Sequence, residues 1–204
     1  MSAVAEPRSG PLTPKARETR AALLRSAADE FVERGYAAVS VRDLARRNRV
    51  TSGAIYGHFR NKADLLAEVV EERIATDLEH ASRDPGPTSL RTYLGRQWRN
   101  YRSRRALRTL LVEGAAAART DADVRARIGE LQEAKLREWQ AIYRRIQSDE
   151  GLDPDADMET LVVLLWAAEL GLGLLEALDV ELPRPGAWGR IVERLVGSFE
   201  GGDR

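Results

Sequence analysis

The feature that most constrains this fold is a turn of only three residues, Asn48 to Val50, between two short segments with helical signals, residues 41–47 and 51–58. Ser40 and Asp43 have the spacing of a capping box, which predicts where the first of these helices begins. A turn this short forces the two helices to cross steeply. The sequence therefore predicts helix-turn-helix geometry at this point of the chain.

The second helix of the pair is a poor helix former by composition. Residues 51–58 contain two glycines, so we expect this helix to be held by packing against residues 14–34 rather than by its own propensity. A small residue such as Gly53 lets a helix backbone approach the base edges and phosphates of a DNA major groove. Thr51 and Ser52 place hydroxyl and backbone N–H groups at the N-terminus of this helix, where they can meet a phosphate or a base edge. The pattern predicts a segment that reads DNA.

The charge distribution favours a polyanionic partner for the first third of the chain. The formal net charge is zero, but residues 1–62 contain 12 Lys and Arg against 6 Asp and Glu, whereas residues 63–204 contain 20 against 26. A basic segment beside an acidic remainder is expected of a chain that contacts nucleic acid at one end only. The chain has no cysteine, which excludes disulfides, thiolate metal sites and cysteine nucleophiles.

One segment raises the question of a membrane span. Residues 161–178, LVVLLWAAELGLGLLEAL, are apolar over nearly the length that a bilayer requires. Glu169 lies near the middle, where a carboxylate in a bilayer costs about 2.5–3.5 kcal/mol. We therefore expect no membrane span, but a helix that is buried in protein and apolar on nearly all sides. No segment of the chain alternates with period 2, so we predict an all-α fold of about nine helices.

Residues 35–66, GYAAVSVRDLARRNRVTSGAIYGHFRNKADLL, resemble the DNA-binding segment of the tetracycline-repressor-like (TetR) family of bacterial transcription regulators. The pattern formed by Tyr56, His58, Phe59 and Lys62 is characteristic of that family. Beyond this segment the resemblance rests on length and helicity alone. It implies an N-terminal three-helix helix-turn-helix domain that binds DNA, followed by a larger helical domain that binds a ligand and dimerises.

This resemblance divides the chain into three parts. We expect a disordered arm over residues 1–13, the DNA-binding domain over residues 14–61, and an effector-binding and dimerisation domain over residues 62–204. Within the last of these, residues 62–80 are expected to form a helix that links the two domains.

The resemblance also implies which side chains face DNA. Tyr56, His58 and Lys62 would mostly bind phosphate, and Phe59 would fill the core. The residues expected to face DNA are Arg42, Arg49, Thr51, Ser52, Gly53, Tyr56, His58 and Lys62.

The segment departs from the family pattern in the turn and in the second helix. Arg49 stands where family members usually have glycine, since the backbone there favours a left-handed conformation. Arginine in that conformation costs about 1 kcal/mol, unless Asn48 shares the strain. We expect Arg49 to offset this cost by reaching a phosphate. Ser52 and Gly57 replace residues that are often larger or basic, which affects the operator sequence that the chain would read.

Aromatic residues recur at helical spacing in the larger domain. Such a domain can enclose an apolar pocket with few polar groups. Glu169, one turn beyond Trp166, is the polar candidate. The alternative interpretation is that the aromatic residues are ordinary core and that Glu169 reaches solvent at a rim. The candidate ligand-binding residues are Trp98, Tyr101, Trp139, Tyr143, Trp166 and Glu169.

Two apolar helices near the C-terminus indicate a dimer. Gly171 and Gly173 allow close helix–helix approach, and two such helices per chain can pair with their symmetry mates in an isologous four-helix interface. The alternative is that the same faces pack within the monomer. The candidate interface residues are Leu164, Gly171, Leu172, Leu175, Trp188, Ile191, Val192, Leu195 and Phe199.

These observations favour a cytoplasmic, ligand-responsive transcriptional regulator, most simply a repressor. Its expected partners are an inverted-repeat operator in double-stranded DNA, a second copy of the chain and a small apolar or amphipathic effector. A regulator that responds to a protein partner, with a sealed core in place of a pocket, is the first alternative. A helical enzyme is the second, but the chain offers only His58 and His80, no cysteine and no metal-ligand spacing, so we expect neither cofactor nor metal.

Overall fold

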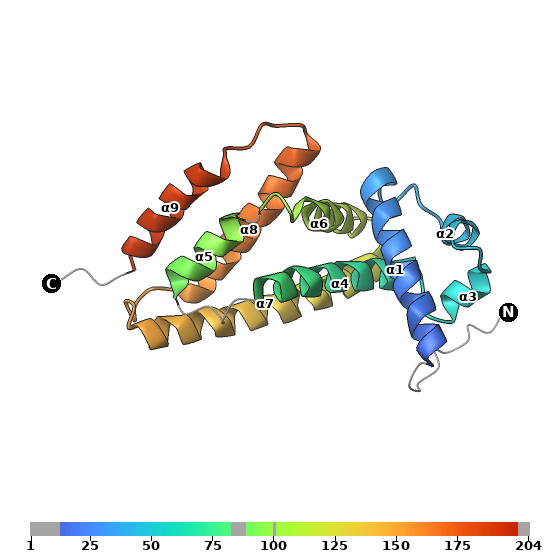
Figure 1. Ribbon diagram of the computed structural model, residues 1–204, viewed down its shortest axis with the longest axis horizontal. Coiled ribbons are helices and arrows are strands. Elements are labelled where there is room, and N and C mark those ends of the chain that lie inside the picture. The colour runs from blue at the N-terminus through green and yellow to red at the C-terminus, as the bar shows by residue number, and fades with distance from the viewer. Residues whose placement is uncertain (1–12, 83–88, 100, 200–204) are drawn as a thin grey trace. The chain divides into compact units, whose positions relative to one another are not determined.

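The computed structural model of the 204-residue chain describes residues 13–82, 89–99 and 101–199, apart from the side chains at 77–82, 96–99 and 185. Over these residues the chain forms nine α-helices and no β-strand, which confirms the predicted all-α fold class (Figure 1). The arm predicted for residues 1–13 lies outside the described residues except for Thr13. The helices are α1 (Pro14–Arg34), α2 (Val41–Arg47), α3 (Ser52–Tyr56), α4 (Lys62–Ser82), α5 (Leu90–Arg99), α6 (Arg105–Ala117), α7 (Ala122–Glu150), α8 (Met158–Ala177) and α9 (Pro185–Gly197).

The chain divides into two compact units. The first contains the described residues up to Ile74 together with Leu110–Leu131, and the second contains Ala75–Thr109 together with the described residues from Gln132 onward. The first unit therefore includes the start of α4 and parts of α6 and α7, beyond the DNA-binding domain predicted to end at residue 61. The functional boundary at that residue stays a prediction.

Local hydrogen bonds set the starts of the two short helices in the first unit. Ser40 Oγ accepts from the backbone N–H of Asp43 at 3.1 Å, and the Asp43 carboxylate accepts from the backbone N–H of Ser40 at 3.3 Å. This reciprocal pair is the predicted capping box. Thr51 Oγ1 accepts from the backbone N–H of Ala54 at 3.1 Å and caps α3 in the same way.

Helix α3 depends on tertiary packing for its stability. It contains five residues, far fewer than an isolated helix needs in water. Its Ile55 is 1% exposed, as are Leu44 of α2 and Phe59 just after α3, and Phe31 of α1 is fully buried. α2 packs against both α1 and α3. The sequence-based expectation that packing holds this helix is consistent with this burial.

We expected α8 to be apolar on nearly all sides and buried in protein, and within the single chain only one face of it is buried. One face of the helix, which includes Met158, Leu161, Val162 and Leu172, lies in the core of the second unit. The opposite face is left uncovered because α8 is apolar around its whole circumference and the chain packs against only one side. Large side chains exposed on α8 are Val163, Leu164, Leu174 and Leu175. By length and composition α8 is one described helix that could cross a membrane, and a third of its apolar window is buried.

Candidate functional site

The exposed surface of α3 begins at its cap. Thr51 and Gly53 are exposed and Ser52 is half-buried. A Cβ atom at Gly53 would meet only Thr51 Oγ1, at 3.8 Å, which is ordinary contact. Nothing within the described chain therefore requires glycine at this position, and a partner that approaches the α3 backbone from outside is a physical reason for it.

The turn between α2 and α3 has the left-handed residue at the predicted position. Arg49 has a φ of 54°, whereas Asn48 has a φ of −89° and a ψ of 3°. The strain therefore lies at Arg49 and is not shared. Asn48 fastens the turn instead, because its Nδ2 donates to the Leu44 carbonyl at 2.8 Å and to Ser26 Oγ of α1 at 2.9 Å. The Arg49 side chain is exposed.

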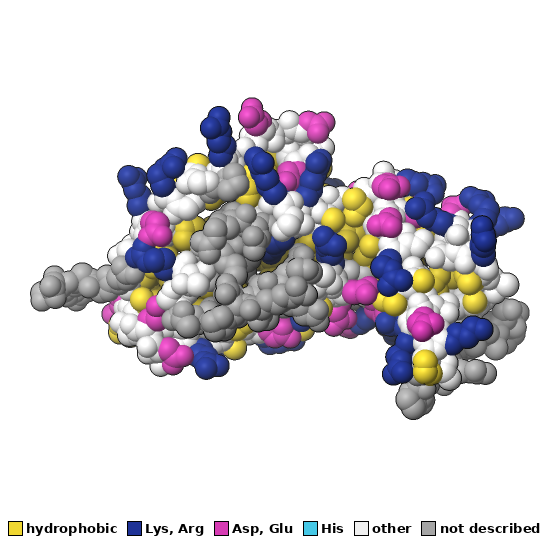
Figure 2. Space-filling view, in the orientation of Figure 1, with side chains coloured by type: hydrophobic (Ala, Val, Ile, Leu, Met, Phe, Trp, Pro, Cys, Tyr) yellow, Lys and Arg dark blue, Asp and Glu magenta, His cyan; other side chains and the backbone are white. Residues whose placement is uncertain are grey.

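Tyr56 and Arg42 lie on the outside of the first unit. Tyr56 is 48% exposed, which does not fit an ordinary core aromatic. Arg42 is also exposed. The nearby Arg46 pairs with Asp43 at 2.8 Å, and Arg47 pairs with the buried carboxylate of Glu30. Figure 2 shows Lys and Arg side chains over α1 to α3, with acidic side chains among them.

His58 is less available than the family pattern implies. It is half-buried, and its Nδ1 is buried without a hydrogen-bond partner among the described residues. Burial, and then the positive charge of Arg20, lower the pKa of His58 below its ordinary value. A phosphate would therefore meet a neutral imidazole at neutral pH.

Lys62 is engaged inside the first unit. Its Nζ lies 4.0 Å from the centre of the Tyr36 ring, which is a cation–π contact. Burial lowers the pKa of Lys62, and the charge of Asp121 opposes that effect. Tyr36 is fixed in turn, because its backbone N–H donates to the Glu113 carboxylate at 2.7 Å and its hydroxyl donates to Asp121 at 3.4 Å. Lys62 thus has a structural contact besides the predicted phosphate contact.

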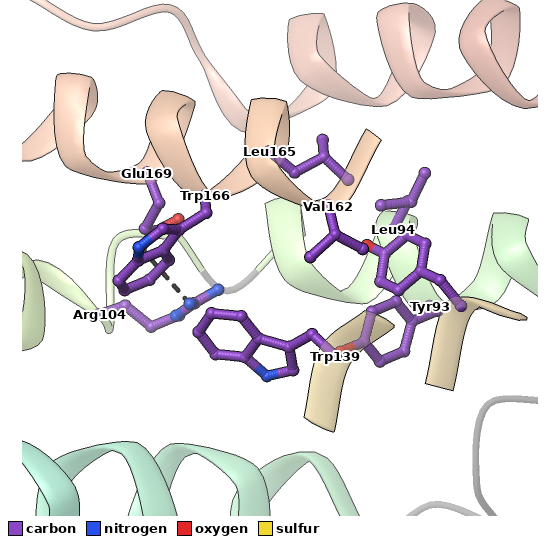
Figure 3. A pocket seen from close by; sticks show the side chains of 9 residues that line it. Tyr93, Leu94, Arg104, Trp139, Val162, Leu165, Trp166 and Glu169 are labelled. Carbon is purple, nitrogen blue, oxygen red and sulfur yellow. Dashed lines mark ion pairs between the residues drawn. The ribbon is translucent and has the colours of Figure 1, made fainter. Parts of the chain in front are cut away.

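The second unit contains a small aromatic pocket with a cavity volume of about 50 Å³ (Figure 3). It brings together four of the predicted ligand-binding residues, Trp139, Tyr143, Trp166 and Glu169. Tyr101 is buried, but its hydroxyl donates to the Pro183 carbonyl at 3.0 Å and it does not line the pocket. The side chain of Trp98 lies outside the described residues.

Five of the lining residues were not among the candidates predicted from the sequence. The helical spacing of the residues on α8 could have identified two of them. Val162, Leu165, Trp166 and Glu169 are spaced i, i+3, i+4 and i+7, so they share one face of α8. Arg104 gave no such signal, since it lies in the turn before α6. The lining residues absent from the candidate set are Tyr93, Leu94, Arg104, Val162 and Leu165, although Tyr93 is one of the aromatic residues that recur at helical spacing.

Buried charge lies at one end of the pocket. Glu169 is 7% exposed, so the interpretation that it reaches solvent at a rim is wrong. Its Oε1 lies 3.3 Å from Arg108 Nη1 and 3.5 Å from Arg104 Nη2. Arg108 is fully buried and donates to both carboxylate oxygens of Glu176 at 2.7 Å, and also to the Tyr101 carbonyl.

Aromatic rings form the remaining walls. The ring centres of Trp139 and Trp166 are 4.9 Å apart with the planes tilted by 52°. Tyr93 meets Tyr143 edge to face, with the centres 5.3 Å apart. Burial raises the pKa of Tyr143 well above its ordinary value, so its hydroxyl stays protonated. The pocket can therefore surround an apolar group with π faces and present charge at one end.

The residues predicted for a dimer interface are exposed, buried or partly buried in the single chain. Leu164 is 61% exposed, Ile191 is 59% exposed and Leu175 is 38% exposed, and Gly171 faces open space. Leu172 and Val192, in contrast, are buried in the core of the second unit. The partly buried residues of the predicted set, which pack against the same core, are Trp188, Leu195 and Phe199.

Comparison with known proteins identifies the N-terminal helices as a DNA-binding domain. Residues 23–69 match the model of the bacterial regulatory proteins of the tetR family. The HTH-type transcriptional repressor Rv3405c of Mycobacterium tuberculosis is 37% identical over 73 residues, which are 36% of this chain and 38% of that protein. The chain thus spans well under half the length of the curated relatives it matches.

Solved structures share the fold over nearly the whole chain. A transcriptional regulator from Rhodococcus sp., described as TetR-family, has a TM-score of 0.76 at 18% identity and covers 91% of this chain and 100% of its own. The regulator FadR from Bacillus subtilis, solved in complex with stearoyl-CoA, has a TM-score of 0.68 at 17% identity and covers 85% of this chain and 96% of its own. At these identities the likeness establishes the fold alone.

A helix-turn-helix domain followed by a larger helical region defines a class of bacterial transcriptional regulators. Within that class, residues 23–69 of this chain match the DNA-binding domain of the tetR family.

Proposed function

We propose that the chain is a homodimeric repressor that binds an inverted-repeat DNA operator and is released from it when a small effector occupies the pocket. The observation that carries this proposal is the presence, in one chain, of an exposed helix-turn-helix surface and an aromatic pocket with a buried charged end. If the effector and the operator favour different conformations, linkage makes each lower the affinity for the other.

The proposed DNA contacts follow from exposure. Tyr56 and Arg42 reach phosphates, and Gly53 lets the α3 backbone approach the groove. Thr51 and Ser52 contribute hydroxyl groups at the start of α3. Because these contacts are mostly to phosphate, affinity should fall steeply as salt rises.

The uncovered face of α8 supports the dimer. Leu164 and Leu174 are each more than half exposed, and Gly171 between them leaves room for a neighbouring backbone. Exposed apolar side chains on one helix face mark an interaction site. A second copy of the chain is the proposed occupant, because two short recognition helices bind usefully only when a dimer spans two half-sites.

The pocket supports control by a small molecule over control by a protein partner. FadR, which shares the fold, is solved with stearoyl-CoA, and Rv3405c carries the name of a repressor. Our proposal includes a cytoplasmic location and no enzymatic activity, since the curated relatives are transcriptional regulators.

The test is selection of bound sequences from a random DNA pool by the purified chain, repeated at two salt concentrations. An inverted repeat should be enriched, and Tyr56→Ala should weaken binding to it, whereas Arg144→Ala, at an exposed position on α7, should leave it unchanged. If no sequence were enriched, the proposed function would be contradicted.

A further inference from the structure

We propose that the pocket selects an effector that carries a positive charge, such as an ammonium group bearing small alkyl or aryl substituents. This inference rests on the proposed function, because it names the chemical class of the effector for the same site. It is carried by the loosely paired carboxylate of Glu169 and by the four aromatic rings that line the pocket.

The first argument is that Glu169 is held less tightly than a buried carboxylate requires. Its two ion-pair distances, 3.3 and 3.5 Å, exceed the roughly 2.7–2.9 Å of a charge-assisted hydrogen bond. Both of these distances are to Oε1 of the Glu169 carboxylate. Arg108 contacts Glu169 through Nη1 alone, because its Nε and Nη2 donate to the two oxygens of Glu176 at 2.7 Å.

The second argument is the sign of the field from the aromatic rings. Trp139, Trp166, Tyr93 and Tyr143 line the pocket, and aromatic faces carry partial negative charge. A cation within about 6 Å of such a ring is attracted to it, and Trp is the strongest of these side chains in this respect. An anion would instead meet negative ring faces and the carboxylate of Glu169.

The third argument is size. A cavity of about 50 Å³ corresponds to about three to five water positions, at about 10–15 Å³ for each. Tetramethylammonium has a comparable number of heavy atoms. The cavity therefore fits a compact charged head group rather than a whole extended ligand.

Arg104 is the lining residue that opposes a cation. Its guanidinium lies 3.5 Å from the same Glu169 oxygen, so an incoming cation competes with it for the carboxylate. Removal of the Arg104 charge should therefore strengthen cation binding, whereas removal of the Glu169 charge should weaken it. An anionic effector requires the opposite pair of results.

The experiment measures the binding of three small probes of similar shape by NMR titration of the purified full-length chain without DNA. The probes are tetramethylammonium, tert-butanol and pivalate, which are cationic, neutral and anionic. We expect tetramethylammonium to bind about tenfold tighter than tert-butanol. Glu169→Gln should remove about that tenfold preference, and Arg104→Gln should increase affinity for the cation several-fold, while neither changes tert-butanol binding by more than about twofold.

Glu159→Gln is the matched control, because it removes an exposed carboxylate from the same helix, α8, but lies outside the pocket lining. It should leave the cation preference intact. Thermal unfolding of each variant checks the fold. If Glu169→Gln fails to fold, Trp139→Leu takes its place, and about a threefold to thirtyfold loss of cation affinity is then expected from the lost ring.

A preference for pivalate that Arg104→Gln abolishes would overturn the inference, and so would equal affinity for all three probes. Because these titrations contain no DNA, they are independent of repression. If the cation bound but did not change the affinity for the operator, the inference about effector charge would stand and the proposed release mechanism would be contradicted.

Discussion

The left-handed turn residue offers a substitution that should raise stability and lower DNA affinity at the same time. Arg49 has a φ of 54° and an exposed side chain, and its backbone N–H donates to the Arg46 carbonyl at 3.2 Å. Arg49→Gly keeps this hydrogen bond and removes the steric cost of the Cβ atom. It also removes the charge that we propose contacts a phosphate.

The expected size follows from two opposing effects. A residue with a Cβ atom in the left-handed region costs about 1–2 kcal/mol. Glycine also gives the unfolded chain more conformational freedom, which lowers the free energy of unfolding by about 0.4–1 kcal/mol. The net gain in the free energy of unfolding should be about 0.5–1 kcal/mol. For a chain of this length that is an increase of about 1–4 °C in Tm.

The effect on DNA binding should appear in its salt dependence. Loss of one phosphate contact per protomer lowers the slope of log affinity against log salt by about 0.9, or about 1.8 for a dimer. Arg49→Ala is the matched control, because it removes the same charge but keeps the Cβ atom. The alanine variant should lower the slope of log affinity against log salt by the same amount as the glycine variant, but it should not gain stability.

Thermal unfolding and fluorescence-anisotropy titrations against the selected operator, at several salt concentrations, provide both measurements. If the alanine variant gained as much stability as the glycine variant, backbone strain at Arg49 would not be the cause. If neither variant changed the salt slope, Arg49 would not contact a phosphate.

Three further predictions concern the first unit and the α8 surface. The pKa of His58 is lowered below its ordinary 6.5 in the folded chain, so the unfolded chain takes up a proton first as pH falls. The contribution of neutral His58 to the free energy of unfolding is therefore complete above about pH 6.5 and is lost as pH falls toward the lower folded-state pKa. His58→Gln should therefore flatten the loss of stability between about pH 7 and 5 in urea denaturation, and an unchanged pH profile would refute this. Glu113→Ala should lower the free energy of unfolding by about 1.5–3 kcal/mol, since the carboxylate accepts the Tyr36 N–H at 2.7 Å, whereas Glu33→Ala, at an exposed position on α1, should have little effect. Leu164→Glu should convert the dimer to monomer in analytical ultracentrifugation, while Ala141→Glu, on the exposed side of α7, should not; a Leu164→Glu dimer would place the interface elsewhere.

The sequence by itself determined the local architecture of the first unit. The capping box of Ser40 and Asp43, the left-handed conformation at Arg49 and the short capped helix after it all appear where the sequence predicts them. The position of each feature depends on residues within a few positions of one another, so local sterics and hydrogen bonds set where it occurs. The stability of α3 still depends on tertiary packing, because a helix of five residues does not persist alone.

Only the tertiary structure decided the environment of the pocket and of α8. The apolar pattern of α8 runs around the whole helix, so it could not indicate which face the chain covers and which it leaves exposed. Glu169 and Arg108 are 61 residues apart in sequence, yet they meet in the buried charged cluster beside the pocket. No periodicity within one helix encodes such a pairing, because it depends on how separate helices pack against one another.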